Sequence, residues 1–123
     1  MTRQGLIALC LMYPDAFEDY PFGGKEAGGV VWTAIRHICN KKTFAFIFER
    51  DGLCVNLKCE PAQADMLRQL FDGITAAYHM NKTHWNTVRV DSDVPLDVLQ
   101  DMLDESYRLS APRLRKKLNT EES

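Results

Sequence analysis

The segment from Tyr78 to Arg89, YHMNKTHWNTVR, interleaves basic, amide and aromatic side chains more closely than an ordinary loop does. Its lysine and arginine can neutralise phosphates and release counterions. The rings of Tyr78 and Trp85 can stack on nucleic-acid bases, a contact worth about 1–3 kcal/mol for each base. The amides of Asn81 and Asn86 can hydrogen-bond to base edges or phosphates. This mixture of residue types predicts a binding surface.

Six residues are our candidates for contacting nucleic acid or another partner: Lys58, Asn81, Lys82, His84, Trp85 and Arg89. Lys58 joins the set because residues 53–58 alternate as a strand, which places Asn56 and Lys58 on one face. A structural interpretation is also open, in which Trp85 packs in the core and the asparagines hold the turn backbone. For Lys58, the alternative interpretation is a solvated strand face.

The histidines and cysteines do not follow a metal-binding or catalytic pattern. His79 and His84 lie five residues apart, whereas a helical metal site uses a spacing of four. No nucleophile is marked beside either histidine. The four cysteines are Cys10, Cys39, Cys54 and Cys59. They include no C-x-x-C pair and lie among apolar neighbours, so we expect buried, reduced thiols. We therefore expect no metal, no cofactor and no catalytic residue.

Turn-forming residues divide the chain into helices and extended segments. We expect helices over residues 2–12, from Pro61 to about Phe71, and from Pro95 to about Tyr107, because apolar residues recur there at helical spacing. Residues 14–29 are rich in proline and glycine and predict a loop. Strands are expected at 30–38, 43–49, 53–58, 74–78 and 86–90, with an Asp51-Gly52 hairpin turn after the second.

These elements together predict an α/β fold of the α+β kind, in which helices pack on an antiparallel sheet of about five strands. The chain has 123 residues, which suits one domain with a single core. We expect that domain to span residues 1–118. Residues 119–123 are expected to form a disordered tail.

Charge and hydropathy indicate which partners and which cellular compartment to expect for the protein. The formal net charge is −2, which does not favour nucleic acid for the molecule as a whole. An acidic block from Asp91 to Glu105 precedes a basic block from Arg108 to Lys117. Of these two blocks, only the basic one suits a polyanion. No apolar run is long enough to cross a membrane, and residues 6–12 are interpreted as a helix rather than a signal peptide. We expect a cytoplasmic monomer without membrane contact.

Several segments resemble the MmcQ/YjbR family, in order and over nearly the whole chain. They are Asp19-Tyr20-Pro21-Phe22-Gly23, Phe44-Ala45, Asn56-Leu57-Lys58-Cys59-Glu60-Pro61, Tyr78-His79-Met80-Asn81-Lys82, His84-Trp85-Asn86-Thr87-Val88, and Ser106-Tyr107 with Leu109. The resemblance implies a frataxin-like (CyaY-like) arrangement and a mostly bacterial family described as DNA-binding through a double-wing motif. It implies no catalytic residue. One departure precedes Phe44, where Arg36 keeps the usual charge but Asn40-Lys41-Lys42 replaces a glycine turn.

Three functions stay open on the sequence alone. The first is a small, non-enzymatic DNA-binding protein, with a regulatory role as one option. In it the hairpin around His79–Trp85 acts as a wing, assisted by Lys58, Arg89 and the basic segment 113–118. The second is a protein- or small-ligand-binding module that uses the same aromatic and basic surface. The third is an enzyme or metal carrier, which requires His79, His84 or a cysteine in a cleft.

Overall fold

A computed structural model describes residues 1–112, and within them it has three helices and eight strands. The helices are α1 (Arg3–Leu11), α2 (Pro61–Leu70) and α3 (Leu96–Ser110). The strands are β1 (Ala16–Asp19), β2 (Glu26–Ala27), β3 (Val30–Val31), β4 (Thr33–His37), β5 (Thr43–Glu49), β6 (Leu53–Lys58), β7 (Ile74–Ala76) and β8 (Trp85–Arg89).

Six of these strands form one antiparallel sheet in the order β1-β4-β5-β6-β8-β7, and β2 pairs with β3 as a separate hairpin. The three predicted consecutive strands at its centre are β4, β5 and β6, each paired with the next. The predicted class, helices packed on an antiparallel sheet, is confirmed. The sheet has one strand more than expected.

Local sequence explains where several elements begin or turn. Thr2 caps α1, because its Oγ1 accepts a hydrogen bond from the Gly5 N–H at 3.0 Å. Pro61 begins α2, where its missing N–H costs nothing. The β5–β6 hairpin turns at Asp51 and Gly52, whose φ angles of 53° and 120° are the positive values that a tight hairpin requires.

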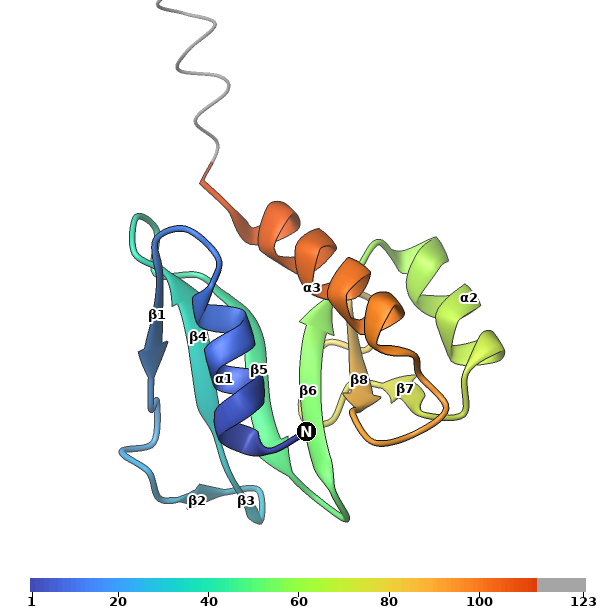
Figure 1. Ribbon diagram of the computed structural model, residues 1–123, viewed down its shortest axis with the longest axis horizontal. Coiled ribbons are helices and arrows are strands. Elements are labelled where there is room, and N and C mark those ends of the chain that lie inside the picture. Colours follow the sequence, from blue (N-terminus) through green and yellow to red (C-terminus); the bar gives the residue numbers. More distant parts are fainter. Residues whose placement is uncertain (113–123) are drawn as a thin grey trace, which may run out of the picture.

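Helices α1 and α3 cover one face of the six-stranded sheet, and α2 lies beside β7 and β8 (Figure 1). The main hydrophobic core lies between these helices and the sheet. In α3, Leu99 and Leu103 are buried against the strands as their spacing predicts, whereas Leu96 in the first turn is 55% exposed. The fully buried large side chains of this core include Leu6, Ile35, Phe44, Ile47, Leu57, Leu99 and Leu103.

An irregularity in β5 divides its aromatic residues between the two faces of the sheet. The pairing register of β5 on β4 shifts between Ile35 and Arg36, which is a β-bulge. Phe44 lies at this shift and belongs to the helix-covered core, where its ring packs against Tyr13 at a centroid distance of 5.6 Å. Phe46 faces the opposite side.

The side of the sheet opposite α1 and α3 is called the open face below, because no helix of residues 1–112 packs on its centre. A second, smaller cluster of apolar side chains lies on it. The Trp32 and Phe48 rings are 4.7 Å apart, and the Phe48 and Tyr78 rings are 5.5 Å apart. Since Trp32 and Tyr78 come from connecting segments, loops from both sides of the sheet close over part of this face.

Some predicted boundaries were wrong. Residues 16–19, predicted as part of a loop, form β1, because they pair with β4 along their whole length. The predicted strand 30–38 is interrupted at Trp32, which separates β3 from β4. The Trp32 indole N–H donates a hydrogen bond to the Ala27 carbonyl at 2.8 Å. Strand β7 ends at Ala76, two residues earlier than predicted, since Tyr78 leaves the sheet to cover the open face.

The cysteines differ from the prediction at one position. Cys10, Cys54 and Cys59 are buried, but Cys39 is exposed in the turn between β4 and β5. Burial raises the pKa of the Cys10 thiol to about 12, which keeps it protonated and unreactive at neutral pH.

Two further expectations concern the chain ends and membranes. The basic segment 113–118 and the tail 119–123 lie outside the described residues. Among the helices that are described, none has the length and apolar content needed to span a membrane.

Candidate functional site

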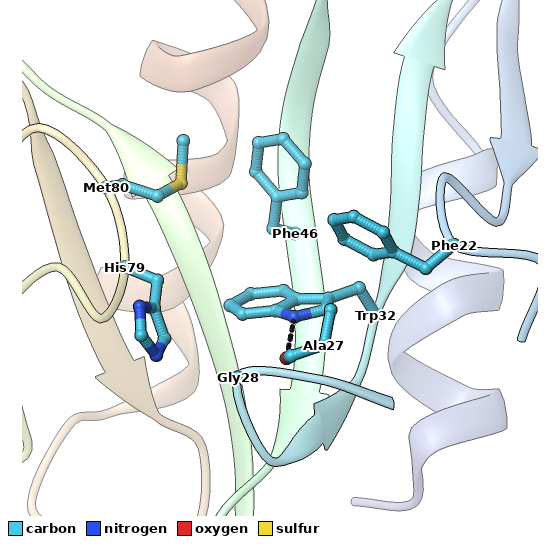
Figure 2. Close-up of a pocket in the computed structure, with 7 residues that line it drawn as sticks. All are labelled: Phe22, Ala27, Gly28, Trp32, Phe46, His79 and Met80. Carbon is cyan, nitrogen blue, oxygen red and sulfur yellow. Dashed lines mark hydrogen bonds between the residues drawn. The ribbon is translucent and has the colours of Figure 1, made fainter. Parts of the chain in front are cut away.

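An apolar hollow of about 350 Å³, which we call the aromatic hollow, lies on the open face. Its lining is Phe22, Ala27, Gly28, Trp32, Phe46, His79 and Met80. Figure 2 shows Phe22, Trp32 and Phe46 gathered on one side and His79 with Met80 on the other. Phe22 is 51% exposed and Phe46 is only partly buried, so aromatic surface is available to a ligand.

Hydrogen bonds and close packing hold the walls of the aromatic hollow in place. The Trp32 indole is fixed on the Ala27 carbonyl, and the Tyr78 hydroxyl donates to the Gly28 carbonyl at 2.8 Å. The His79 ring lies against Gly28 so closely that a Cβ on this glycine would be 2.7 Å from His79 Nε2. Gly28 also has a φ of 64°, which favours glycine there. The β2–β3 hairpin and the segment after β7 are therefore joined along one rim of the hollow.

A second hollow, of about 290 Å³, adjoins the first and is called the basic hollow. Its lining is Lys42, Thr43, Phe46, Lys58, Met80, Trp85 and Ser110. Phe46 and Met80 line both hollows, so the two lie side by side, and together we call them the groove. Among residues 1–112, no acidic side chain lines either hollow. The ion pairs of the described residues involve neither Lys42 nor Lys58, so both ammonium groups can face an anion.

Two of the six candidate residues meet in the groove. Lys58 on β6 and Trp85 on β8 are direct register partners, and both line the basic hollow. The Trp85 ring lies 5.8 Å from the Phe46 ring, at an interplanar angle of 59°. Trp85 is partly exposed, so it combines packing on the sheet with a free ring edge.

Asn81, Lys82 and His84 lie in the loop between β7 and β8, outside the groove lining. The Asn81 side chain accepts a hydrogen bond from the Thr83 N–H at 2.9 Å, which holds the turn. The Lys82 ammonium donates to the Ala77 carbonyl at 2.8 Å, inside its own loop. The His84 carbonyl accepts from the Cys59 N–H at 2.8 Å, while its side chain is exposed. The structural interpretation therefore fits Asn81, and it extends to Lys82.

Arg89 lies on the open face, but its side chain bonds to the tip of the β5–β6 hairpin. Its guanidinium donates to the Arg50 carbonyl at 3.2 Å and also to the Asp51 carbonyl. Next to it, the Arg50 guanidinium lies over the Tyr78 ring, 4.3 Å from the centroid. These cations are engaged within the protein and lie outside the lining of the groove.

Arg68 on α2 supports the loop that carries these residues. Its Nε donates to Asn86 Oδ1 at 2.6 Å, and its Nη2 donates to the carbonyls of Lys82 and Trp85. Asn86 in turn donates to the Ala64 carbonyl at 3.2 Å. Asn86 is thus a buried structural link and not a surface contact, as the structural interpretation holds.

A second buried network holds the start of the same loop. Asn56 donates to the Tyr78 carbonyl at 2.9 Å and accepts from the Thr87 hydroxyl at 2.5 Å. The Thr87 oxygen also accepts from the Tyr78 N–H at 2.9 Å. Because Asn56 is fully buried, its amide satisfies backbone groups that would otherwise lack partners.

Sequence reasoning missed most of the groove. Phe22, Phe46, Met80 and Lys42 were not candidates, and Trp32 was interpreted only as part of a strand. The alternation of β5 contained one usable signal, since Phe46 and Phe48 fall on the face that also carries Lys58. No three histidine, cysteine, aspartate or glutamate side chains of residues 1–112 converge to hold a metal ion.

Comparison with known proteins gives relatives across most of the chain. A family model described as YjbR matches residues 11–109. The uncharacterized protein YjbR of Escherichia coli K12 is 28% identical over 109 residues, which cover 88% of this chain and 86% of that protein. The uncharacterized protein YbdF of Escherichia coli O157:H7 is 32% identical over 112 residues, covering 90% and 78%.

Solved structures show the same arrangement of elements. A crystal structure of a Pseudomonas syringae protein matches with a TM-score of 0.76 at 26% identity, covering 90% of this chain and 100% of that one. A crystal structure of a Deinococcus radiodurans protein matches with a TM-score of 0.76 at 29% identity, covering 96% and 88%.

Proposed function

The chain belongs to the YjbR family, and we propose that it is a non-enzymatic protein that binds DNA through the groove on its open face. The observation that carries the proposal is the pairing of an aromatic floor with two lysines and no acidic lining among the described residues. Aromatic rings bind bases and ammonium groups bind phosphates, so the groove offers both parts of a nucleic-acid site. We propose further that the protein acts as a monomer in the cytoplasm.

The basic hollow is the phosphate-binding part of this proposal. Lys42, in the connection just before β5, and Lys58, the last residue of β6, both line it, together with Thr43 and Ser110. The two ammonium groups are ordinary donors to phosphate oxygens, whereas the Ser110 hydroxyl is buried and already donates to the Ser106 carbonyl. Because the net charge is −2, binding depends on this local patch and not on the charge of the whole molecule.

The proposed DNA site is the groove and not the loop that carries Asn81 and Lys82, where several of the candidates predicted from the sequence lie. Those two side chains and the Arg89 guanidinium already bond to backbone groups, so rebinding them to phosphates would give up contacts that hold the fold. The loop contributes to the site mainly as a wall, through His79 and Met80.

The test is a salt titration of fluorescently labelled oligonucleotide binding, measured by anisotropy. We expect the Lys42→Gln, Lys58→Gln double variant to bind about tenfold more weakly near 50 mM salt. Its slope of log affinity against log salt should be shallower by about 1.4, the contribution of two phosphate contacts to a single strand. Arg108→Gln is the control for loss of a surface cation, because Arg108 is exposed, pairs with Glu105 and lines neither hollow.

The proposal fails if the wild-type protein binds neither single-stranded nor duplex DNA near 50 mM salt. It also fails if Arg108→Gln weakens binding as much as the lysine changes do.

A small-ligand or protein-binding role is the second candidate, and the exposure of Phe22 is the observation that favours it. A ring 51% exposed beside an apolar hollow suits an apolar ligand or a side chain of a partner. Binding of that kind would persist at high salt, unlike binding to DNA.

A further inference from the structure

We propose that the groove selects unpaired bases, so that the protein binds single-stranded DNA in preference to duplex. One base would occupy the aromatic hollow, while its neighbouring phosphates face Lys42 and Lys58. This inference rests on the proposed function and specifies which form of DNA the site accepts.

The aromatic hollow suits the flat face of a base, which a duplex conceals. Phe22 and Phe46 offer partly exposed rings, and Met80 closes the opposite side (Figure 2). In a duplex each base face is covered by its neighbours, so a base would have to unstack and leave its pair before it could enter. A single strand presents its bases without that cost.

The arrangement of charge points the same way. A duplex has the higher charge density, and a purely electrostatic surface therefore favours duplex over single strand. The groove has at one end two lysines that form no ion pair with residues 1–112, and apolar rings at the other. Most of its lining thus interacts with bases, and the preference for single strands should exceed the electrostatic preference for duplex.

Both tryptophans of the chain report on the groove. The chain has two, Trp32 and Trp85, and they line the aromatic and the basic hollow respectively. Bases that enter the groove and stack on its rings should quench intrinsic fluorescence, whereas contact with the phosphates alone should change it little.

The experiment compares a thymidine oligonucleotide of about 12 nucleotides, a length within the range that single-strand sites cover, with a duplex of equal length. We expect the single strand to bind about tenfold or more tightly than the duplex and to quench tryptophan fluorescence. Phe22→Ala should weaken single-strand binding about fivefold and weaken duplex binding by a smaller factor. Leu70→Ala is the control, since Leu70 is a 63% exposed apolar residue on α2, away from the groove.

The outcomes separate this inference from the proposed function. Absence of binding to either form of DNA removes both. Duplex binding equal to or tighter than single-strand binding overturns the inference while DNA binding stands. A Phe22→Ala variant that keeps its circular dichroism spectrum and binds the single strand like wild type also overturns it.

Discussion

Asn56, Thr87 and Asn86 show how buried polar side chains organise this protein one residue at a time. Asn56 and Thr87 bond to both backbone groups of Tyr78, and Asn86 joins α2 to β8. A buried polar group is stable only when its hydrogen bonds are satisfied. The distinctive segment from Tyr78 to Arg89 is therefore largely a structural signature, and it contributes His79, Met80 and Trp85 to the lining of the groove.

His37 gives a residue-scale prediction about pH. It is 2% exposed, and its Nε2 lies 3.0 Å from the Ser110 hydroxyl. Burial lowers the pKa of His37 below its ordinary value of 6.5, so the unfolded chain takes up the proton first. We therefore expect the free energy of unfolding to fall as pH drops below about 6.5, with a slope from this group of at most about 1.4 kcal/mol per pH unit.

Urea unfolding between pH 7.5 and 5.5 measures this effect. The His37→Gln variant, which keeps a polar side chain near Ser110, should show a flatter dependence on pH than the wild type, because it has no proton to gain. Parallel pH dependences in the two proteins would show that His37 does not titrate differently on folding.

At the scale of elements, Arg68 links α2 to the loop between β7 and β8. Its guanidinium reaches one side-chain oxygen and two backbone carbonyls. We expect Arg68→Ala to lower the free energy of unfolding by about 2–3 kcal/mol, since it leaves half-buried acceptors without a charged donor. Thermal or urea unfolding measures the change.

Gln69→Ala, at the next position of α2, is the matched control. Gln69 is exposed and bonds only to Asp65 on its own helix, so its replacement should change stability by less than about 0.5 kcal/mol. Equal losses in the two variants would contradict the role assigned to Arg68.

The elements differ in how far the sequence predicts them. Helix α2 and the β5–β6 hairpin have local signals, a proline at the helix start and an Asp-Gly turn, and both were predicted correctly. Strand β1 has no such signal, because residues 16–19 become a strand only by pairing with β4. The bulge beside Phe44 is equally hidden, since a register shift depends on the partner strand.

The candidate site was harder to predict than the fold for the same reason. Lys58 and Trp85 were recognised by residue type, and their pairing across β6 and β8 brings them together. Phe22 and Trp32 belong to the segment before β4, and only the folded chain places them beside Phe46. Residue type alone also does not show that the Lys82 ammonium bonds to a carbonyl of its own loop.

At the scale of the whole molecule, the fold divides the sheet into a covered and an open face. Helices α1 and α3 complete the main core on one side (Figure 1). On the other side, residues 1–112 place only a small aromatic cluster, with loops at its margins. Among residues 1–112, nothing covers the groove with its aromatic rings and two lysines, and this is the physical basis for the binding function that we propose.

Mapping the contact surface by NMR, with a single-stranded oligonucleotide added to the isotope-labelled protein, tests the central claim most directly. We predict that the largest chemical-shift changes fall on the two indole N–H groups and on the amides of Phe46 and Lys58. The amides of α1 and α2 should change little. Shifts concentrated on His84 and Arg89, on the helices, or on no residue at all would contradict binding in the groove.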